Sequence, residues 1–160
     1  MERWLPLRDY PGYSASDAGW IRNDKRDTKL AIVRSSRRPY VCLIKNGVQV
    51  KRGLSLLIAE AFVQTERKEY FTTPIHLDGD VSNCQAVNLV WRPRWFALKH
   101  TRQFRLAYGD TDPVINLTTR HIYRDVWDVV FEHGVLYMDV LESIYNKTYV
   151  FPLYQTFEWL

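Results

Sequence analysis

The sequence predicts an α+β fold made of three small pieces, and three observations support this class. Turn dipeptides separate short apolar runs near the start of the chain. An Asn46-Gly47 pair stands between two strand-like runs, which is a strong signal for a β-hairpin. Near the end of the chain, Gly134 separates two helix-like segments. We expect the pieces to span residues 1–38, 39–101 and 112–160, with a polar linker before the last one.

The composition is that of a protein with a buried core. The chain has 160 residues, of which 46% are hydrophobic and 14% aromatic. No run of about 18 apolar residues is present, and the N-terminus does not have the pattern of a signal peptide. We therefore expect no membrane partner and no secretion. The two cysteines, Cys42 and Cys84, are expected to be reduced thiols, because they form no metal-binding pattern.

Charge is distributed unevenly along the chain. Residues 1–100 hold 17 Lys and Arg against 10 Asp and Glu, whereas residues 101–160 hold 5 against 8. A basic first part could meet phosphate groups, although an ordinary solvated surface would have the same composition. The candidate nucleic-acid-binding residues are Lys25, Arg26, Lys29, Arg34, Arg37 and Arg38.

The first sixty residues contain several expected elements. Turns are predicted at Pro11-Gly12 and at residues 17–19, followed by a strand over residues 20–22. The hairpin should pair residues 40–44 with residues 48–52 around its Asn-Gly turn. A buried helix is predicted over residues 54–63 because this run is almost continuously apolar.

A loop with candidate catalytic chemistry follows between Pro74 and Trp91. His76 is expected in a turn-rich loop, and its imidazole could accept a proton from water near neutral pH. Asn88 stands twelve positions later, and we expect it to hold the loop together with Asn83. Residues 78–80, Asp-Gly-Asp, are turn formers.

The remaining helices and strands are predicted from residues that typically begin or end such elements. A helix is expected from Arg94 to His100, because Pro93 is suited to a first turn. Two short strands should flank a Thr-Thr-Arg turn in residues 113–123, before helices over residues 125–133 and about 137–145. A last strand should end at Trp159. Late tyrosines, among them Tyr149 and Tyr154, could form a partner interface.

The loop resembles the core of the HNH nucleases, in particular the homing-endonuclease type whose segment reads like NHIDGN…NN…NLEW. The matching residues are His76, Asp78, Gly79, Asn83, Asn88, Leu89 and Trp91. The opening residues also resemble the nuclease-associated module (NUMOD) that precedes such domains. The last fifty residues resemble the small helix-turn-helix module appended to homing nucleases. This resemblance implies a ββα-metal type of core within residues 39–101.

The metal ligands that the resemblance implies are absent from this sequence. The family has Asp or Asn before the histidine, where this chain has Ile75, and Asn or His nine positions after Asn88, where it has Ala97. Phosphodiester hydrolysis of this kind depends on a divalent metal with oxygen ligands. We therefore expect no cofactor, unless Asp78 or Asp80 holds Mg²⁺ or Mn²⁺ instead.

Three functions remain open. In the first, the chain is a catalytically lapsed relative of HNH homing endonucleases, with His76 and Asn88 vestigial. It would then serve with protein partners as a binding or structural component of a larger assembly, such as a bacteriophage particle, in the virion or the host cytoplasm. In the second, it is an active metal-dependent endonuclease that nicks double-stranded DNA. In the third, it binds DNA without cleaving it.

Overall fold

A computed structural model describes all residues of the chain except 65–68, 107–108, 110 and 148–156. The chain forms two compact units. The first comprises Met1–His76 and Asp80–Arg94, and the second comprises Leu77–Gly79 and Trp95–Leu160. Helices and strands are mixed in both units, so the predicted α+β class is confirmed. The predicted division into residues 1–38, 39–101 and 112–160 stays a prediction. Tyr149 and Tyr154, which were considered for a partner interface, lie outside the described residues.

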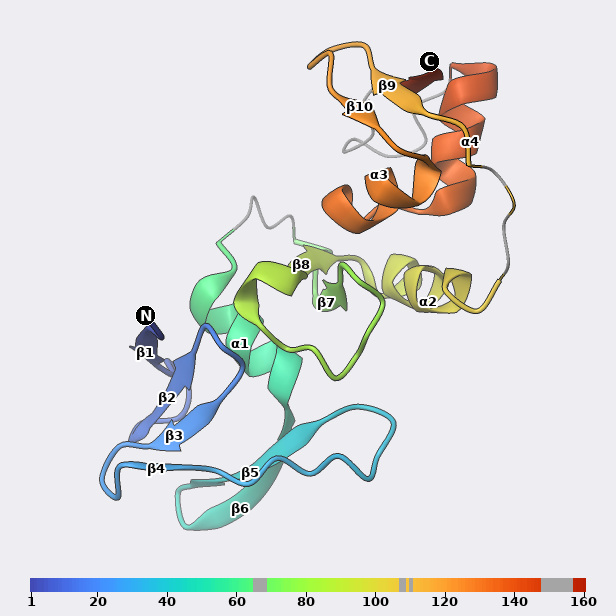
Figure 1. Ribbon diagram of the computed structural model, residues 1–160. Coiled ribbons are helices and arrows are strands. Elements are labelled where there is room, and N and C mark those ends of the chain that lie inside the picture. Colours follow the sequence, from blue (N-terminus) through green and yellow to red (C-terminus); the bar gives the residue numbers. More distant parts are fainter. Residues whose placement is uncertain (65–68, 107–108, 110, 148–156) are drawn as a thin grey trace. The chain divides into compact units, whose positions relative to one another are not determined.

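The first unit opens with a small antiparallel sheet (Figure 1). Its strands lie in the order of the chain: β1 (Trp4–Pro6), β2 (Tyr13–Ser16), β3 (Ile21–Asn23) and β4 (Thr28–Lys29). The predicted turns connect them. Gly12 and Gly19 have φ angles of 89° and 93°, which residues with a side chain rarely adopt.

The predicted hairpin is confirmed, and each strand is one residue longer than expected. Strands β5 (Tyr40–Lys45) and β6 (Val48–Gly53) pair from Tyr40 opposite Gly53 to Lys45 opposite Val48. Asn46 and Gly47 have φ angles of 51° and 75°. Positive φ at both turn positions defines the type I′ turn, whose twist matches that of the two strands.

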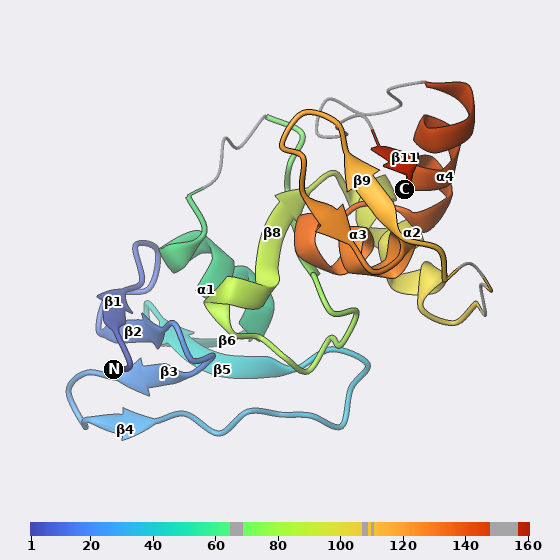
Figure 2. The same ribbon diagram turned by 45° about the horizontal axis from the view of Figure 1, so that its top comes forward.

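Helix α1 (Leu54–Phe62) forms the centre of the first unit. Its buried residues are Leu54, Leu57, Ile58 and Ala59. Figure 1 shows β1 to β3 on one side of α1 and the hairpin of β7 (Thr73–His76) and β8 (Leu89–Arg92) on the other, and β8 keeps this place in Figure 2. A helix covered on several sides needs apolar residues around most of its surface, as this run provides.

The second unit combines three helices with a three-stranded antiparallel sheet. The strands lie in the order β10 (Ile122–Tyr123), β9 (Val114–Asn116), β11 (Phe157–Trp159). The helices are α2 (Arg94–Gln103), α3 (Val126–His133) and α4 (Tyr137–Asn146). The predicted helix from Arg94 thus runs three residues past His100. Among the described residues no helix exceeds ten residues, so none has the length to cross a membrane.

Local signals fix both ends of α3. The Asp125 carboxylate accepts a hydrogen bond of 3.0 Å from the backbone N–H of Asp128, which caps the first turn. Gly134 ends the helix with a φ angle of 60° in the left-handed region. The predicted break between α3 and α4 is therefore confirmed.

An aromatic cluster holds the helices of the second unit together. The ring centroids of Phe104 lie 5.6 Å from those of Trp127 and of Phe131, and Trp127 lies 4.8 Å from Tyr137. Gly79 packs against the same cluster, because a Cβ atom there would lie 2.4 Å from the ring of Phe104. The turn at Leu77–Gly79 therefore belongs to this unit.

Candidate functional site

His76 is the last residue of strand β7 and pairs with Leu89 of β8. The expectation that it stands in a turn-rich loop is wrong, because the antiparallel pairing with β8 continues through His76 and the turn begins at Leu77. Only 5% of His76 is exposed. A general base must reach the water that it activates. This burial leaves little room for such a water molecule.

The imidazole of His76 lies beside a thiol. The distance between His76 Nε2 and Cys84 Sγ is 3.9 Å. Burial raises the pKa of the Cys84 thiol to about 11, so it is protonated at neutral pH. The same sulfur also lies 3.6 Å from the backbone oxygen of Val81, to which the thiol donates. A protonated, buried thiol is inert as a nucleophile, and the pair packs the inside of the loop.

Asn88 holds the loop in the manner expected for this residue. Its Nδ2 donates a hydrogen bond of 2.9 Å to the backbone oxygen of Asn83. Its backbone N–H donates to the backbone oxygen of Gln85, the residue before the 3-10 helix η1 (Ala86–Asn88). The loop is also fixed to the N-terminal sheet, because the N–H of Ala86 donates to the oxygen of Asp17 at 2.9 Å. Asn88 therefore stabilises the loop through main-chain contacts.

The two aspartates proposed as replacement ligands differ in their surroundings. Asp80 accepts hydrogen bonds from the backbone N–H and the hydroxyl of Ser82, at 2.9 and 2.6 Å. These bonds hold the pKa of the Asp80 carboxyl below its ordinary value. Asp78 is exposed in the turn of the second unit. Asp80 thus stabilises the turn in which it stands, as the sequence pattern indicates for this Asp-Gly-Asp segment.

The residues at the positions implied for metal ligands do not fit a metal ion. Ile75 pairs with Val90 inside the β7–β8 hairpin, and Ala97 is on the buried face of α2; each is 2% exposed. Neither side chain has an oxygen or nitrogen atom to offer Mg²⁺ or Mn²⁺. Within the described residues, no group of three or more His, Cys, Asp or Glu side chains is placed to hold an ion.

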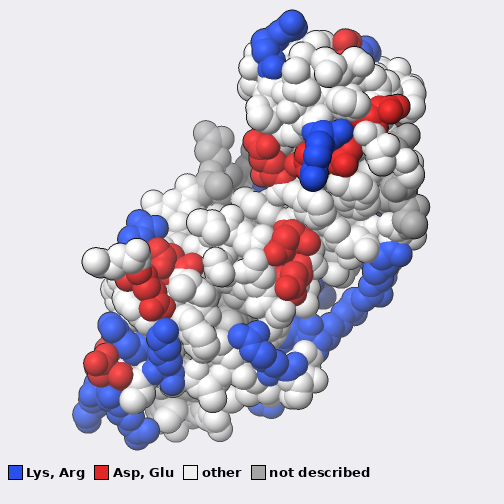
Figure 3. Space-filling view, viewed as in Figure 1, with Lys and Arg blue, Asp and Glu red and all other residues white. Residues whose placement is uncertain are grey.

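The six candidate nucleic-acid-binding residues are all exposed in the first unit. Figure 3 shows Lys and Arg side chains, with acidic ones among them, gathered over the region of β3 and β4 at the lower left. Lys29 differs from the other five, because its Nζ lies 4.7 Å from the ring centroid of Trp20 and 3.4 Å from a carboxylate oxygen of Glu2. The others form no ion pair with a carboxylate of the described residues.

Sequence reasoning missed the basic residues of the β5–β6 hairpin. Lys45 and Arg52 share the face that meets Tyr10, whose hydroxyl accepts a hydrogen bond of 2.5 Å from Arg52 Nε. Lys51 lies on the opposite face, over the ring of Tyr40 at 5.4 Å. All three are exposed. The sequence feature that could have identified them is a set of basic residues in the two strands that flank an Asn-Gly turn.

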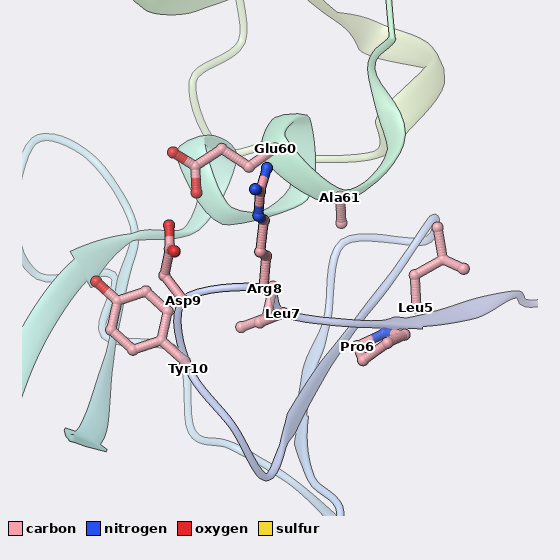
Figure 4. A pocket seen from close by; sticks show the side chains of 8 residues that line it. All are labelled: Leu5, Pro6, Leu7, Arg8, Asp9, Tyr10, Glu60 and Ala61. Carbon is pink, nitrogen blue, oxygen red and sulfur yellow. The ribbon is translucent and has the colours of Figure 1, made fainter. Parts of the chain in front are cut away.

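A separate cavity of about 420 Å³ lies in the first unit (Figure 4). Residues 5–10 line one side of it, and Glu60 and Ala61 of α1 line the other. None of the residues of the HNH-like loop contributes to its walls. The cavity is therefore distinct from the candidate site at His76.

The fold is similar to that of a solved HNH homing endonuclease. It matches a solved structure described as "DNA binding and cleavage by the HNH homing endonuclease I-HmuI", with a TM-score of 0.55 over 99% of this chain and 98% of that chain. The sequence identity is 16%, so the likeness is one of fold. No family model matches the sequence, and no curated protein is similar to it in sequence.

Proposed function

We propose that this chain is a DNA-binding protein built on the HNH homing-endonuclease fold, whose metal site has lapsed, so that it binds duplex DNA without cutting it. The observation that carries the proposal is Ile75. The position that the resemblance gives to a metal ligand is instead a buried apolar side chain, which pairs with the half-buried Val90. In this proposal His76 and Asn88 keep the structure of the loop and have no catalytic role.

The chemistry of phosphodiester hydrolysis supports the loss of cleavage. The developing charge on the leaving oxygen needs a cation beside it, and a divalent ion normally supplies that charge. Placing a carboxylate at Ile75 would bury it among apolar neighbours, at a cost that only a bound ion or another partner would offset. An isoleucine there favours packing instead.

Positive charge and shape support DNA as the ligand. Five exposed cations of the first unit form no ion pair with a described carboxylate and can meet phosphates: Lys25, Arg26, Arg34, Arg37 and Arg38. Arg34 is also near enough to Asp80 to contribute to the lowered pKa of that carboxyl. The β5–β6 hairpin is a two-stranded ribbon with three further cations, and the major groove of B-DNA admits such a ribbon. I-HmuI, whose fold the chain shares, binds DNA.

In the second unit, the helix pair α3 and α4 is less suited to binding DNA phosphates than the basic segments of the first unit. Helix α4 carries Asp139 and Glu142, and carboxylates repel the DNA backbone. We therefore assign the DNA contact to the first unit. Cleavage with Asp78 or Asp80 as substitute ligands remains the alternative, and Asp80 is already bonded to Ser82. A role in a bacteriophage particle stays a prediction from the resemblance.

Binding to a labelled duplex in EDTA tests the proposal. We expect the full chain to bind, with log K falling linearly against log salt at a slope of roughly −3 to −5, because about five phosphates are neutralised. Fluorescence anisotropy at several salt concentrations gives this slope. Adding Mg²⁺ in place of an equal ionic strength of Na⁺ should not tighten binding. Binding that requires Mg²⁺, or no binding at low salt, would contradict the proposal.

A further inference from the structure

An amphipathic surface on the second unit is not used by the proposed function. Helix α2 buries Phe96, Ala97, His100 and Gln103. Its outward residues follow the spacing i, i+3, i+4, i+7 and are Trp95, Leu98, Lys99 and Arg102. Trp95 and Leu98 are 52% and 50% exposed, which is unusual for two large apolar residues on one helix face.

The surface continues into a cavity between the end of α2 and the start of α4. The cavity has a volume of about 300 Å³. Leu106, Leu136 and Met138 provide its apolar lining, and Lys99 and Arg102 line it on the α2 side. Leu106 and Met138 are 56% and 57% exposed. We call this region, together with Trp95 and Leu98, the α2–α4 surface.

Gln103 lines the cavity and forms two hydrogen bonds with the residues around the start of α4. The side chain of Gln103 accepts a bond of 2.7 Å from the backbone N–H of Tyr137 and donates one of 3.3 Å to the oxygen of Val135. These two bonds tie α2 to the first turn of α4. A partner that binds a preformed cavity loses less free energy to ordering it.

The charges around this surface indicate which chemistry would be complementary to it. Lys99, Arg102 and Arg105 are exposed and form no ion pair with a carboxylate of the described residues. Asp139 also lines the cavity on the α4 side, so the balance near the apolar lining stays positive. An apolar depression beside cations is complementary to a segment with apolar and acidic side chains.

We propose that the α2–α4 surface docks an acidic amphipathic segment of another protein, which places one large apolar side chain in the cavity and its carboxylates against Lys99 and Arg102. Helix-in-groove recognition has this arrangement. A concave site favours a protruding side chain over a lipid bilayer, which presents no such side chain. Trp95 would then be the aromatic anchor at the edge of the contact.

Three peptides of about 16 residues, which is roughly four helical turns, test the proposal with the full chain. The first is a fluorescein-labelled amphipathic helix with Leu and Phe on one face and Glu on the other. The second has Lys in place of Glu, and the third has Ala in place of Leu and Phe. We expect the first to bind with a Kd on the order of 10 μM and the other two at least about tenfold more weakly.

Variants then locate the contact. Leu106→Glu and, separately, Arg102→Glu should weaken the first peptide by about tenfold or more, because each removes one half of the complementarity. Ile122→Glu is the matched control, since Ile122 is similarly exposed on β10 of the same unit. It should leave binding unchanged, and circular dichroism verifies the fold of each variant.

Several results would overturn the inference. These are equal binding of the Lys peptide, no binding of the Glu peptide, or an equal effect of Ile122→Glu. In the last comparison, anionic vesicles and single-stranded DNA are tested as ligands in place of the peptides. If either bound and lost its binding with Leu106→Glu while the Glu peptide did not bind, the surface would belong to that ligand and the protein partner would be excluded.

Discussion

Trp91→Ala is expected to lower the free energy of unfolding by about 3–5 kcal/mol, because it removes a large ring from the core of the first unit. Trp91 is 1% exposed on β8. Its indole Nε1–H donates a hydrogen bond of 2.9 Å to the backbone oxygen of Val63, which follows the end of α1. The substitution therefore leaves a cavity and also removes the donor that satisfies this carbonyl.

Urea unfolding monitored by circular dichroism measures this loss. Val87→Ala is the control, because Val87 is an exposed residue of the same loop. It should change the free energy of unfolding by no more than about 0.5 kcal/mol. A loss below about 1 kcal/mol for Trp91→Ala would mean that the β7–β8 hairpin does not pack on α1 as described.

The combined substitution Arg34→Gln, Arg37→Gln and Arg38→Gln should weaken duplex binding by roughly ten- to a hundredfold near 100 mM salt. It should also make the salt slope about 2.7 units shallower, since each lost phosphate contact removes about 0.9. The three arginines stand on the segment between β4 and β5, are exposed, and form no ion pair with a described carboxylate. Their removal should cost the fold little.

A charge-matched control distinguishes the effect of where the arginines stand from the effect of the lowered net charge. Arg102→Gln, Arg105→Gln and Arg120→Gln remove the same three charges from exposed positions of the second unit. This variant should alter the duplex affinity by less than about threefold, and its salt slope should stay unchanged. If both variants weakened binding equally, the DNA contact would not be specific to the first unit.

Local features of the fold were predictable from the sequence. The Asn46-Gly47 turn and the Gly134 helix stop were predicted because each depends on backbone angles that few residues adopt. The strand ends were not predicted, because the pairing includes Lys45 opposite Val48 and Tyr40 opposite Gly53. Helix α2 was predicted to end at His100 but continues to Gln103. The sequence has no stop signal close to either residue, so it does not define the end of this helix.

Features that depend on contacts distant in the sequence were not predictable. Lys29 was expected to be available for phosphate, yet Trp20 and Glu2 engage it across the small sheet. The burial of His76 beside Cys84 likewise depends on how the loop folds back on the hairpin. The outward Trp95 of α2 could not be distinguished from a core residue, because its exposure is a property of the packed unit.

The contrast between Ile75 and His76 bears most on function. Ile75 has no side-chain atom that could bind a metal ion, and in the structure it is buried and pairs with Val90. His76, although it matches the family motif, is buried at the end of the same strand. Both observations support the proposal that this hairpin stabilises the core of the first unit and has no catalytic role.

A nicking assay on supercoiled plasmid tests the loss of cleavage most directly. The wild-type chain and His76→Ala are incubated with Mg²⁺ or Mn²⁺, and nicking and gel shift are scored in the same samples. We predict a salt-sensitive shift by both proteins and no nicking by either with either metal. Metal-dependent nicking by the wild type that His76→Ala abolishes would contradict the account, and would show that other side chains have replaced the missing ligands.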